Sequence, residues 1–136
     1  MALNAQTATA SRDLALNAAF DILNSGFYDG YDSTQPTNAN TALGAQVKLW
    51  RMSLGATAFA ASASASKSAN AITQDSSADA TGTATWATLI ASTRATAGTM
   101  DMSAGTGTVN LVLNSASIVS GAAVSCSALT ITQAAT

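Results

Sequence analysis

The chain has 136 residues, a formal net charge of -2 and 9% charged residues, and it contains no histidine. Because ordinary soluble domains carry roughly 25% charged residues, hydroxyls, amides and methyl groups must cover most of this surface. The absence of histidine excludes the Ser-His-Asp and Cys-His catalytic arrangements and any imidazole metal ligand. We therefore expect a protein without enzymatic activity, cofactor or metal.

The charged residues also limit the partners. Five basic residues are scattered among seven aspartates, so the sequence shows no basic stripe for nucleic acid. No run reaches the roughly 18 apolar residues of a membrane-spanning helix, and residues 1–13 lack the pattern of a secretory signal. Because so weakly charged a surface is poorly protected against association, we expect a homo-oligomer or larger assembly. Cys126 is the one cysteine, and we expect it to be a small buried thiol.

The chain begins with a polar segment followed by a helical pattern. Residues 1–10 are small and polar, which predicts an extended N-terminal arm. Ser11 or Thr9 is expected to cap the following helix, with Asp13 in the first turn, where a negative charge complements the helix dipole.

The helix itself is predicted over residues 12–24. Leu16, Phe20 and Leu23 have the spacing of one helical face, and the run Asn24-Ser25-Gly26 is typical of a left-handed helix end.

Short strands are predicted in the middle of the chain. Residues 27–32 indicate a strand interrupted at Gly30, and residues 33–44 form a long polar loop that holds the one proline. Residues 46–54 carry apolar side chains on both faces, which is typical of a strand covered on two sides. Residues 57–71 consist mainly of Ala and Ser, and we expect them to pack against a neighbouring backbone or another subunit.

Further strands follow the polar loop at residues 74–80. Ile72 ends one short strand, residues 83–92 favour another with Trp86 as core anchor, and residues 99–103 predict a third.

The strongest β pattern lies at residues 105–132. Val109, Leu111 and Leu113 alternate with more polar residues. Gly121 supplies the positive φ that a hairpin needs, and a bulge near Ser127 or Ala128 would reconcile the opposite phases of the apolar residues on either side.

These elements predict a mainly β fold. We expect a single β-sandwich or jelly-roll-like domain over residues 11–136, with seven or eight short strands, one N-terminal helix and an arm at residues 1–10.

Two pairs of carboxylates are candidates for an ion-binding or catalytic site. Asp75 and Asp79 lie in a loop with the oxygen ligands that calcium requires, but without the spacing, glycine and terminal Glu of a known calcium loop. Turn chemistry is the preferred interpretation, and ion binding there stays an alternative. A turn around Gly30 is enough to account for Asp29 and Asp32, so we assign them no catalytic role.

The aromatic side chains are the other candidates. An aromatic platform for a sugar would draw on the rings of Phe27, Tyr28, Tyr31, Trp50 and Trp86. Because only 5% of the residues are aromatic, we expect most of these rings in the core, with Tyr31 as the exception beside the long loop. A carbohydrate-binding module using Tyr31 and Trp50 is a minor alternative.

Two runs carry a resemblance to a known group of proteins. They are NAITQDSSADATGTATWATL at residues 70–89 and NLVLNSASIVSGAAVSCSALTIT at residues 110–132. With residues 27–36, they resemble small virion proteins of tailed bacteriophages, which share an Ala/Thr/Ser-rich middle, a TSADATGTA-aromatic segment and an ending of the LNxxSIxxGxxVxxxSxTIT type. The resemblance covers most of the chain and departs from the pattern between residues 94 and 103.

The resemblance implies a capsid decoration (cement) protein, made in the host cytoplasm, that binds the major capsid protein or other virion proteins at the capsid surface. A tail, neck or fibre-base location in the same virion is the alternative. Assembly contacts are expected in the arm and the long loop, which are the segments least able to fold alone. The candidates are Leu3, Asn4, Tyr31, Pro36 and Leu43.

Overall fold

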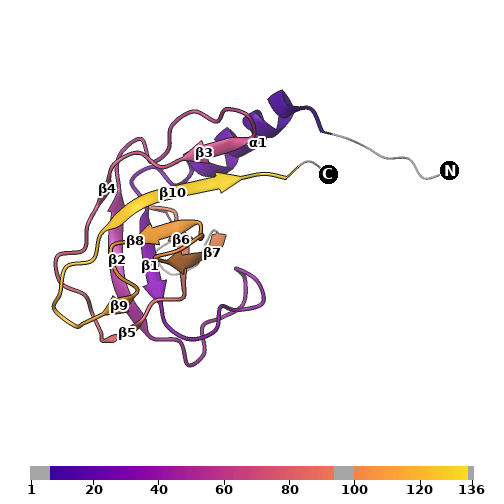
Figure 1. Ribbon diagram of the computed structural model, residues 1–136. Helices are drawn as coiled ribbons and strands as arrows, with labels where there is room; N and C mark the ends of the chain where they lie inside the picture. Colours follow the sequence, from indigo (N-terminus) through magenta and orange to yellow (C-terminus); the bar gives the residue numbers. More distant parts are fainter. Residues whose placement is uncertain (1–6, 94–99, 135–136) are drawn as a thin grey trace.

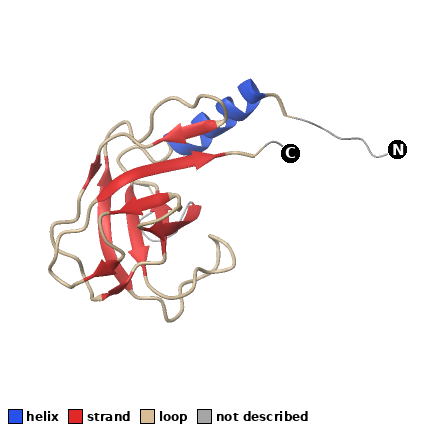
Figure 2. Ribbon diagram, in the orientation of Figure 1, coloured by secondary structure: helices blue, strands red, loops and turns tan. Residues whose placement is uncertain are grey.

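A computed structural model describes residues 7–93 and 100–134 of the chain (Figure 1). One helix and ten strands follow one another in these residues (Figure 2). They are α1 (Thr9–Asp21), β1 (Phe27–Tyr31), β2 (Lys48–Leu54), β3 (Ser66–Ser68), β4 (Ile72–Thr73), β5 (Gly82–Thr83), β6 (Trp86–Ile90), β7 (Met100–Gly105), β8 (Leu111–Leu113), β9 (Ser117–Ile118) and β10 (Cys126–Thr132).

The strands form a curled sheet of eight and a small sheet of two. The larger sheet has the order β3-β10-β8-β7-β6-β1-β2-β4, and in the smaller one β5 pairs with β9. The described neighbours pair antiparallel except for β7 and β8, which are parallel. Figure 1 shows the sheet curling so that β3 and β10 lie beside α1. The prediction of a mainly β chain with one N-terminal helix is confirmed, with ten strands instead of seven or eight.

The helix α1 buries the face that its sequence predicts. Leu16 and Phe20 lie in the core together with Leu23, which follows the helix. Phe20 also meets Phe59 edge to face, with ring centroids 5.1 Å apart. The helix begins at Thr9, three residues before the expected start, and ends at Asp21.

The predicted start of α1 is wrong, whereas the left-handed residue predicted after the helix is present. The N-cap is Ala8, which has no polar side chain to cap the helix, and Asp13 lies beyond the first turn. The Thr9 hydroxyl accepts a hydrogen bond from the Arg12 guanidinium. At the other end Ser25 has the left-handed conformation, with φ of 57°. Its N–H donates to the Gly55 carbonyl, so a contact with a distant segment fixes this turn. Gly26 is required for a different reason, since a Cβ there would collide with the Leu23 and Ile90 carbonyl oxygens.

One apolar cluster fills the inside of the curled sheet. It joins α1 and strands from both halves of the chain, so neither half could form it alone. Its buried members are Leu16, Phe20, Leu23, Tyr28, Leu49, Trp50, Met52, Leu54, Ala58, Phe59, Ala78, Ala84, Ala87, Leu89, Ala91, Ala104, Leu111, Leu113, Ile118, Val124, Leu129 and Ile131.

The C-terminal strands agree with the predicted alternation. Leu111 and Leu113 are buried in β8, and Leu129 and Ile131 are buried in β10. The pairing of β10 with β8 shifts register between Cys126 and Ala128, which confirms the predicted bulge.

The hairpin predicted around Gly121 is wrong, although Gly121 does have a positive φ of 83°. The strand before it, β9, pairs with β5 instead of returning to β10. Residues 121–124, which follow β9, pair with residues 75–78, which precede β5. The backbones of Asp75 and Val124 exchange two hydrogen bonds, and the Gly121 N–H donates to the Ala78 carbonyl. Two polar segments distant in sequence therefore satisfy each other's backbone groups.

The strand β1 runs through Gly30 without the predicted interruption. Gly30 pairs with Trp50 of β2, and the register of that pairing shifts between Gly30 and Tyr31. A Cβ at position 30 would collide with the Trp50 indole ring. The glycine is therefore present because the ring lies directly over the backbone.

We expect Gly30→Ala to lower the free energy of unfolding by about 2 kcal/mol, because overpacking a core typically costs about 1–3 kcal/mol. Urea-induced unfolding, followed by tryptophan fluorescence, measures the change. Gly107→Ala is the matched control, since a Cβ at Gly107 meets nothing within 4 Å. Equal unfolding midpoints for the two variants would contradict this account of Gly30.

Candidate functional site

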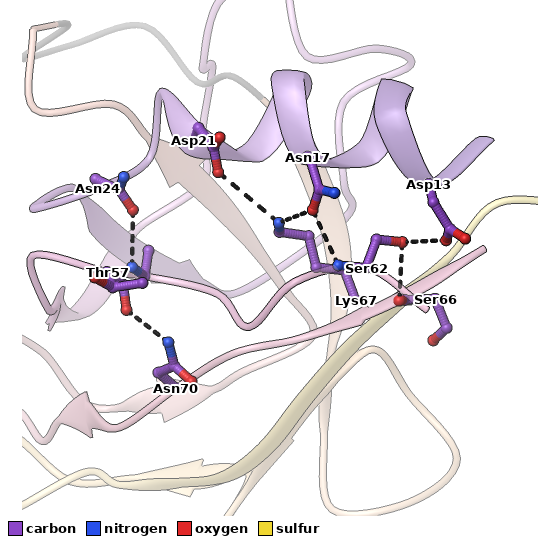
Figure 3. A network of polar contacts seen from close by, with 10 residues as sticks. Asp13, Asn17, Asp21, Asn24, Thr57, Ser62, Ser66, Lys67 and Asn70 are labelled. Carbon is purple, nitrogen blue, oxygen red and sulfur yellow. Dashed lines mark hydrogen bonds and ion pairs between the residues drawn. The ribbon is translucent and has the colours of Figure 1, made fainter. Parts of the chain in front are cut away.

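Two polar side chains of α1, Asp13 and Asn17, point toward the rest of the chain. Asp13 accepts hydrogen bonds from the Ser62 hydroxyl at 2.6 Å and from the Ala65 N–H at 2.9 Å. The Asn17 side-chain oxygen accepts from the Ser62 N–H at 2.9 Å and from the Lys67 ammonium at 2.6 Å. We call Asp13, Asn17, Asp21, Ser62, Ala65 and Lys67 the helix seam. Figure 3 shows its members other than Ala65 from close by.

The helix seam holds a strained turn in place. Ala63 and Ser66 exchange two backbone hydrogen bonds around Ser64 and Ala65, whose φ angles are 53° and 57°. Two positive φ values in succession define the hairpin turn that normally requires Asn-Gly, and other residues adopt it at a cost. The hydrogen bond from Ala65 to Asp13 supports this conformation from outside the turn. Residues 57–71 thus pack against the chain's own helix.

Lys67 is the buried cation of the helix seam. Its side chain is 2% exposed, and its ammonium lies 2.6 Å from Asn17 Oδ1 and 3.8 Å from Asp21 Oδ1. A buried charge needs such partners because its transfer from water is costly. Asp21 itself is 68% exposed, so it reaches the amine from the solvent side.

Because Asp13 and Asn17 face inward, several apolar residues of α1 are left on its solvent side. Leu14 is 71% exposed and Ile22, just after the helix, is 52% exposed. The alanines between them, Ala15, Ala18 and Ala19, are exposed or partly exposed. This reverses the usual pattern, in which the solvent face of a surface helix is polar. We call these five residues the α1 outer face.

A shallow groove adjoins the α1 outer face. It has a volume of about 340 Å³ and lies between α1 and the end of β10. Its lining is mainly apolar and consists of Ala15, Leu16, Ala19, Phe20, Ile131, Thr132 and Gln133. The groove extends the exposed apolar residues of the α1 outer face toward the end of β10.

The long loop that was predicted as a contact region is irregular, as expected, but it is fastened at its base. The Gln46 side chain accepts from the Gly44 N–H and donates to the Thr34 carbonyl. The Asp32 carboxylate accepts from the Val47 N–H at 2.7 Å. These bonds fix where the two ends of the loop lie.

The predicted assembly contacts that the structure describes differ in how exposed they are. Leu3 and Asn4 lie outside the described residues. Leu43 is 47% exposed and Pro36 is half-buried. Tyr31 is 6% exposed, because its ring stacks on Trp86 at 4.7 Å. Tyr31 is therefore inside the fold and offers no ring face to a partner, contrary to the prediction.

The aromatic platform is not formed by the described residues. Trp50 and Tyr28 are fully buried, and Trp86 is 2% exposed. Phe27 lies beneath the Arg51 guanidinium, whose Cζ is 5.0 Å from the ring centroid. The rings build the core, as the composition indicated, and the tryptophan of the suggested sugar site has no exposed surface.

One of the carboxylates that the sequence assigned to turns, Asp29, forms an ion pair instead. Asp29 lies in β1, is buried, and receives two hydrogen bonds of 2.6 Å from the Arg51 guanidinium. These bonds raise the pKa of Arg51. A turn around Gly30 is thus the wrong explanation for Asp29.

Asp75 and Asp79 point to separate partners. The Asp75 carboxylate accepts from the Arg51 and Ser77 N–H groups, and Asp79 pairs with Lys48 at 2.9 Å. Among the described residues no group of three or more acidic, cysteine or histidine side chains is placed to hold a metal ion.

Tyr28 and Cys126 have pKa values above those of exposed side chains of the same type. Burial raises the pKa of Tyr28, and the nearby Cys126 raises it further. Burial also raises the pKa of the Cys126 thiol, which is half-buried and donates to the Ala128 carbonyl.

The α1 outer face and the helix seam were missed by the sequence reasoning. Leu14 and Ile22 are eight residues apart with alanines between them, so the helix pattern contains a second apolar face. Lys67 stands out as the one charged residue within residues 57–71. Both features are present in the sequence, but only the fold shows that the second apolar face is exposed and that Lys67 is buried.

Comparison with family models, curated proteins and solved structures finds no match to this chain. Within residues 7–93 and 100–134 no helix has both the length and the apolar character needed to cross a bilayer.

We expect Arg51→Met to lower the free energy of unfolding by about 2 kcal/mol. The substitution leaves the buried Asp29 carboxylate without its cation, which costs about 3–5 kcal/mol for fully buried pairs, and Arg51 is 38% exposed, so water offsets part of the loss. Lys48→Met is the control, because it breaks the exposed pair with Asp79 and should cost less than about 1 kcal/mol. Urea unfolding at neutral pH compares them, and equal losses would contradict the assignment.

Tyr28 should make the protein less stable in alkali. An unfolded tyrosine ionises near pH 10, whereas folded Tyr28 has a raised pKa and keeps its proton. Its contribution to stability is therefore complete below about pH 10 and falls as the pH rises further. Tyr28→Phe should flatten the dependence of unfolding free energy on pH above about pH 10. Cys126→Ala should instead flatten the region that begins near pH 8.5. Unchanged slopes, measured by urea unfolding across this range, would contradict both assignments.

Proposed function

We propose that the chain is a non-enzymatic structural protein of a tailed-phage virion and, within the virion, a decoration protein bound to the major capsid lattice. The α1 outer face is the observation that carries this proposal. A helix that turns Asp13 and Asn17 inward and exposes Leu14 and several alanines, with Ile22 exposed just after it, is suited to being covered by another protein. The resemblance of residues 70–89 and 110–132 to small virion proteins supplies the identity of that partner.

The composition supports the same proposal. With 9% charged residues, the protein has little repulsion to overcome when it lies against a neighbour. Its mechanism would be mass action, because a subunit that binds the assembled shell and not the free capsid protein stabilises the shell by its binding free energy. No covalent or catalytic step is needed for this role.

The proposal includes the finer description of the fold. A sandwich or jelly-roll-like arrangement is supported by the shared core, in which Tyr28 and Met52 from β1 and β2 belong to one cluster with Leu111 and Leu129 from β8 and β10. The curl of the sheet thus packs its two halves on a common interior. Location at the capsid surface and assembly as a homo-oligomer belong to the same proposal.

We expect the double variant Leu14→Asp/Ile22→Asp to fold normally and to lose binding to shells of the corresponding phage. Two carboxylates placed on a surface that becomes desolvated should lower affinity by at least about 100-fold, since buried unpaired charges are costly. Cosedimentation with empty shells measures binding, and circular dichroism checks the fold. Val119→Asp is the matched control, because Val119 is equally exposed but belongs to the segment after β9.

Two outcomes would oppose the proposal. Unchanged shell binding by the double variant would show that the α1 outer face is not the contact. Immunogold labelling of purified virions that finds the protein at the tail, neck or fibre base, with none on the shell, would replace the capsid assignment by the alternative location.

A further inference from the structure

A lysine amine and an asparagine amide lie in contact inside the helix seam. Lys67 Nζ is 2.6 Å from Asn17 Oδ1, and the lysine side chain is 2% exposed. The same oxygen accepts the Ser62 N–H at 2.9 Å. Because both neighbours are donors, the atom that faces them is the carbonyl oxygen of Asn17, and its amide nitrogen points elsewhere. Figure 3 shows the three groups together.

A carboxylate completes the group. Asp21 Oδ1 lies 3.8 Å from Lys67 Nζ and follows Asn17 by one helical turn. Asp13, one turn earlier, is engaged by Ser62 and Ala65 and acts to position the segment. The helix seam therefore contains a nucleophile, a carbonyl polarised by a backbone N–H, and a solvent-exposed carboxylate 3.8 Å from the amine, a separation that one water molecule can bridge for proton transfer.

We propose that Lys67 and Asn17 form an intramolecular isopeptide bond. The Lys67 amine, after giving a proton to Asp21, attacks Cγ of Asn17, and the negative charge that develops on Oδ1 is stabilised by the Ser62 N–H. The Cγ–Nδ2 bond then breaks as Asp21 returns its proton to the leaving nitrogen. The attacking nitrogen loses its second proton to the departing ammonia, which leaves as ammonium. One C–N bond forms and one breaks, so the products are the neutral secondary amide and one ammonium ion, and the Asp21 carboxylate is regenerated.

The local structure allows these movements. The amine lies at the oxygen, so attack on Cγ requires rotation about the terminal C–C bonds of the Lys67 side chain, while Oδ1 keeps its hydrogen bond to the Ser62 N–H. Asn17 is partly exposed at its helix, which gives ammonia a path to solvent.

The reaction would remove an unfavourable feature of the fold. A buried ammonium is replaced by a neutral amide, so the cost of keeping that charge from water disappears. The bond also links α1 to β3 across 50 residues of chain and closes the seam that holds the Ser64–Ala65 turn.

Mass spectrometry of the purified wild-type protein, denatured before measurement, tests the proposal directly. We expect an intact mass lower than that of the sequence by one ammonia, about 17 Da. Trypsin should no longer cleave after Lys67, and a digest should contain peptide 13–48 joined to peptide 52–94. The full sequence mass, with normal cleavage at Lys67, would overturn the proposal.

Variants assign the roles. Lys67→Arg and Asn17→Ala should each restore the full mass, whereas Lys48→Arg, at a lysine outside the helix seam, should retain the loss of ammonia. Asp21→Asn should leave most of the protein uncross-linked after purification, and Asp21→Glu should restore the bond, because proton transfer needs the carboxylate. Complete cross-linking in Asp21→Asn would exclude Asp21 from the reaction, and a retained mass deficit in Lys67→Arg would overturn the proposed bond.

Discussion

The hydrogen bonds that Asp13 and Asn17 accept from residues 62–67 determine how α1 sits on the sheet. Residues 57–71 have few large side chains, so they cannot be held by apolar packing alone. The helix supplies carboxylate and amide oxygens instead, and these bind Ser62, Ala65 and Lys67. The strained turn at Ser64 and Ala65 persists because it is fixed from the side by the helix.

That constraint has a consequence for the surface. Asp13 and Asn17 of α1 are used inside the molecule, and the residues exposed to solvent include Leu14, Ile22 and the alanines between them. The groove beside β10 extends this apolar area. The proposed function and the proposed cross-link thus depend on the same orientation of one helix. The first uses the outer side of the helix, and the second uses the inner side.

The sequence did not predict the α1 outer face or the helix seam, but it did identify the long loop as a separate exposed segment. The long loop was identified because proline and polar residues rarely form regular structure, and Leu43 there is exposed as expected. Tyr31 was misplaced because adjacency to a loop says nothing about which neighbour a ring stacks on, here Trp86. Asp29 was misread because its partner, Arg51, lies on the next strand of the sheet. Burial and pairing between strands depend on distant residues, which a local pattern does not contain.

The amino-acid sequence by itself determined the mainly β composition, the buried face of α1, the positive φ at Gly121 and the bulge near Ala128. Each of these depends on the spacing or backbone freedom of neighbouring residues. Only the tertiary structure decided that β9 pairs with β5, that β1 continues through Gly30 under the Trp50 ring, and that Asn17 of α1 faces inward. These features depend on which distant backbone or side chain satisfies each buried polar group and fills each space, and that choice is made when the whole chain folds.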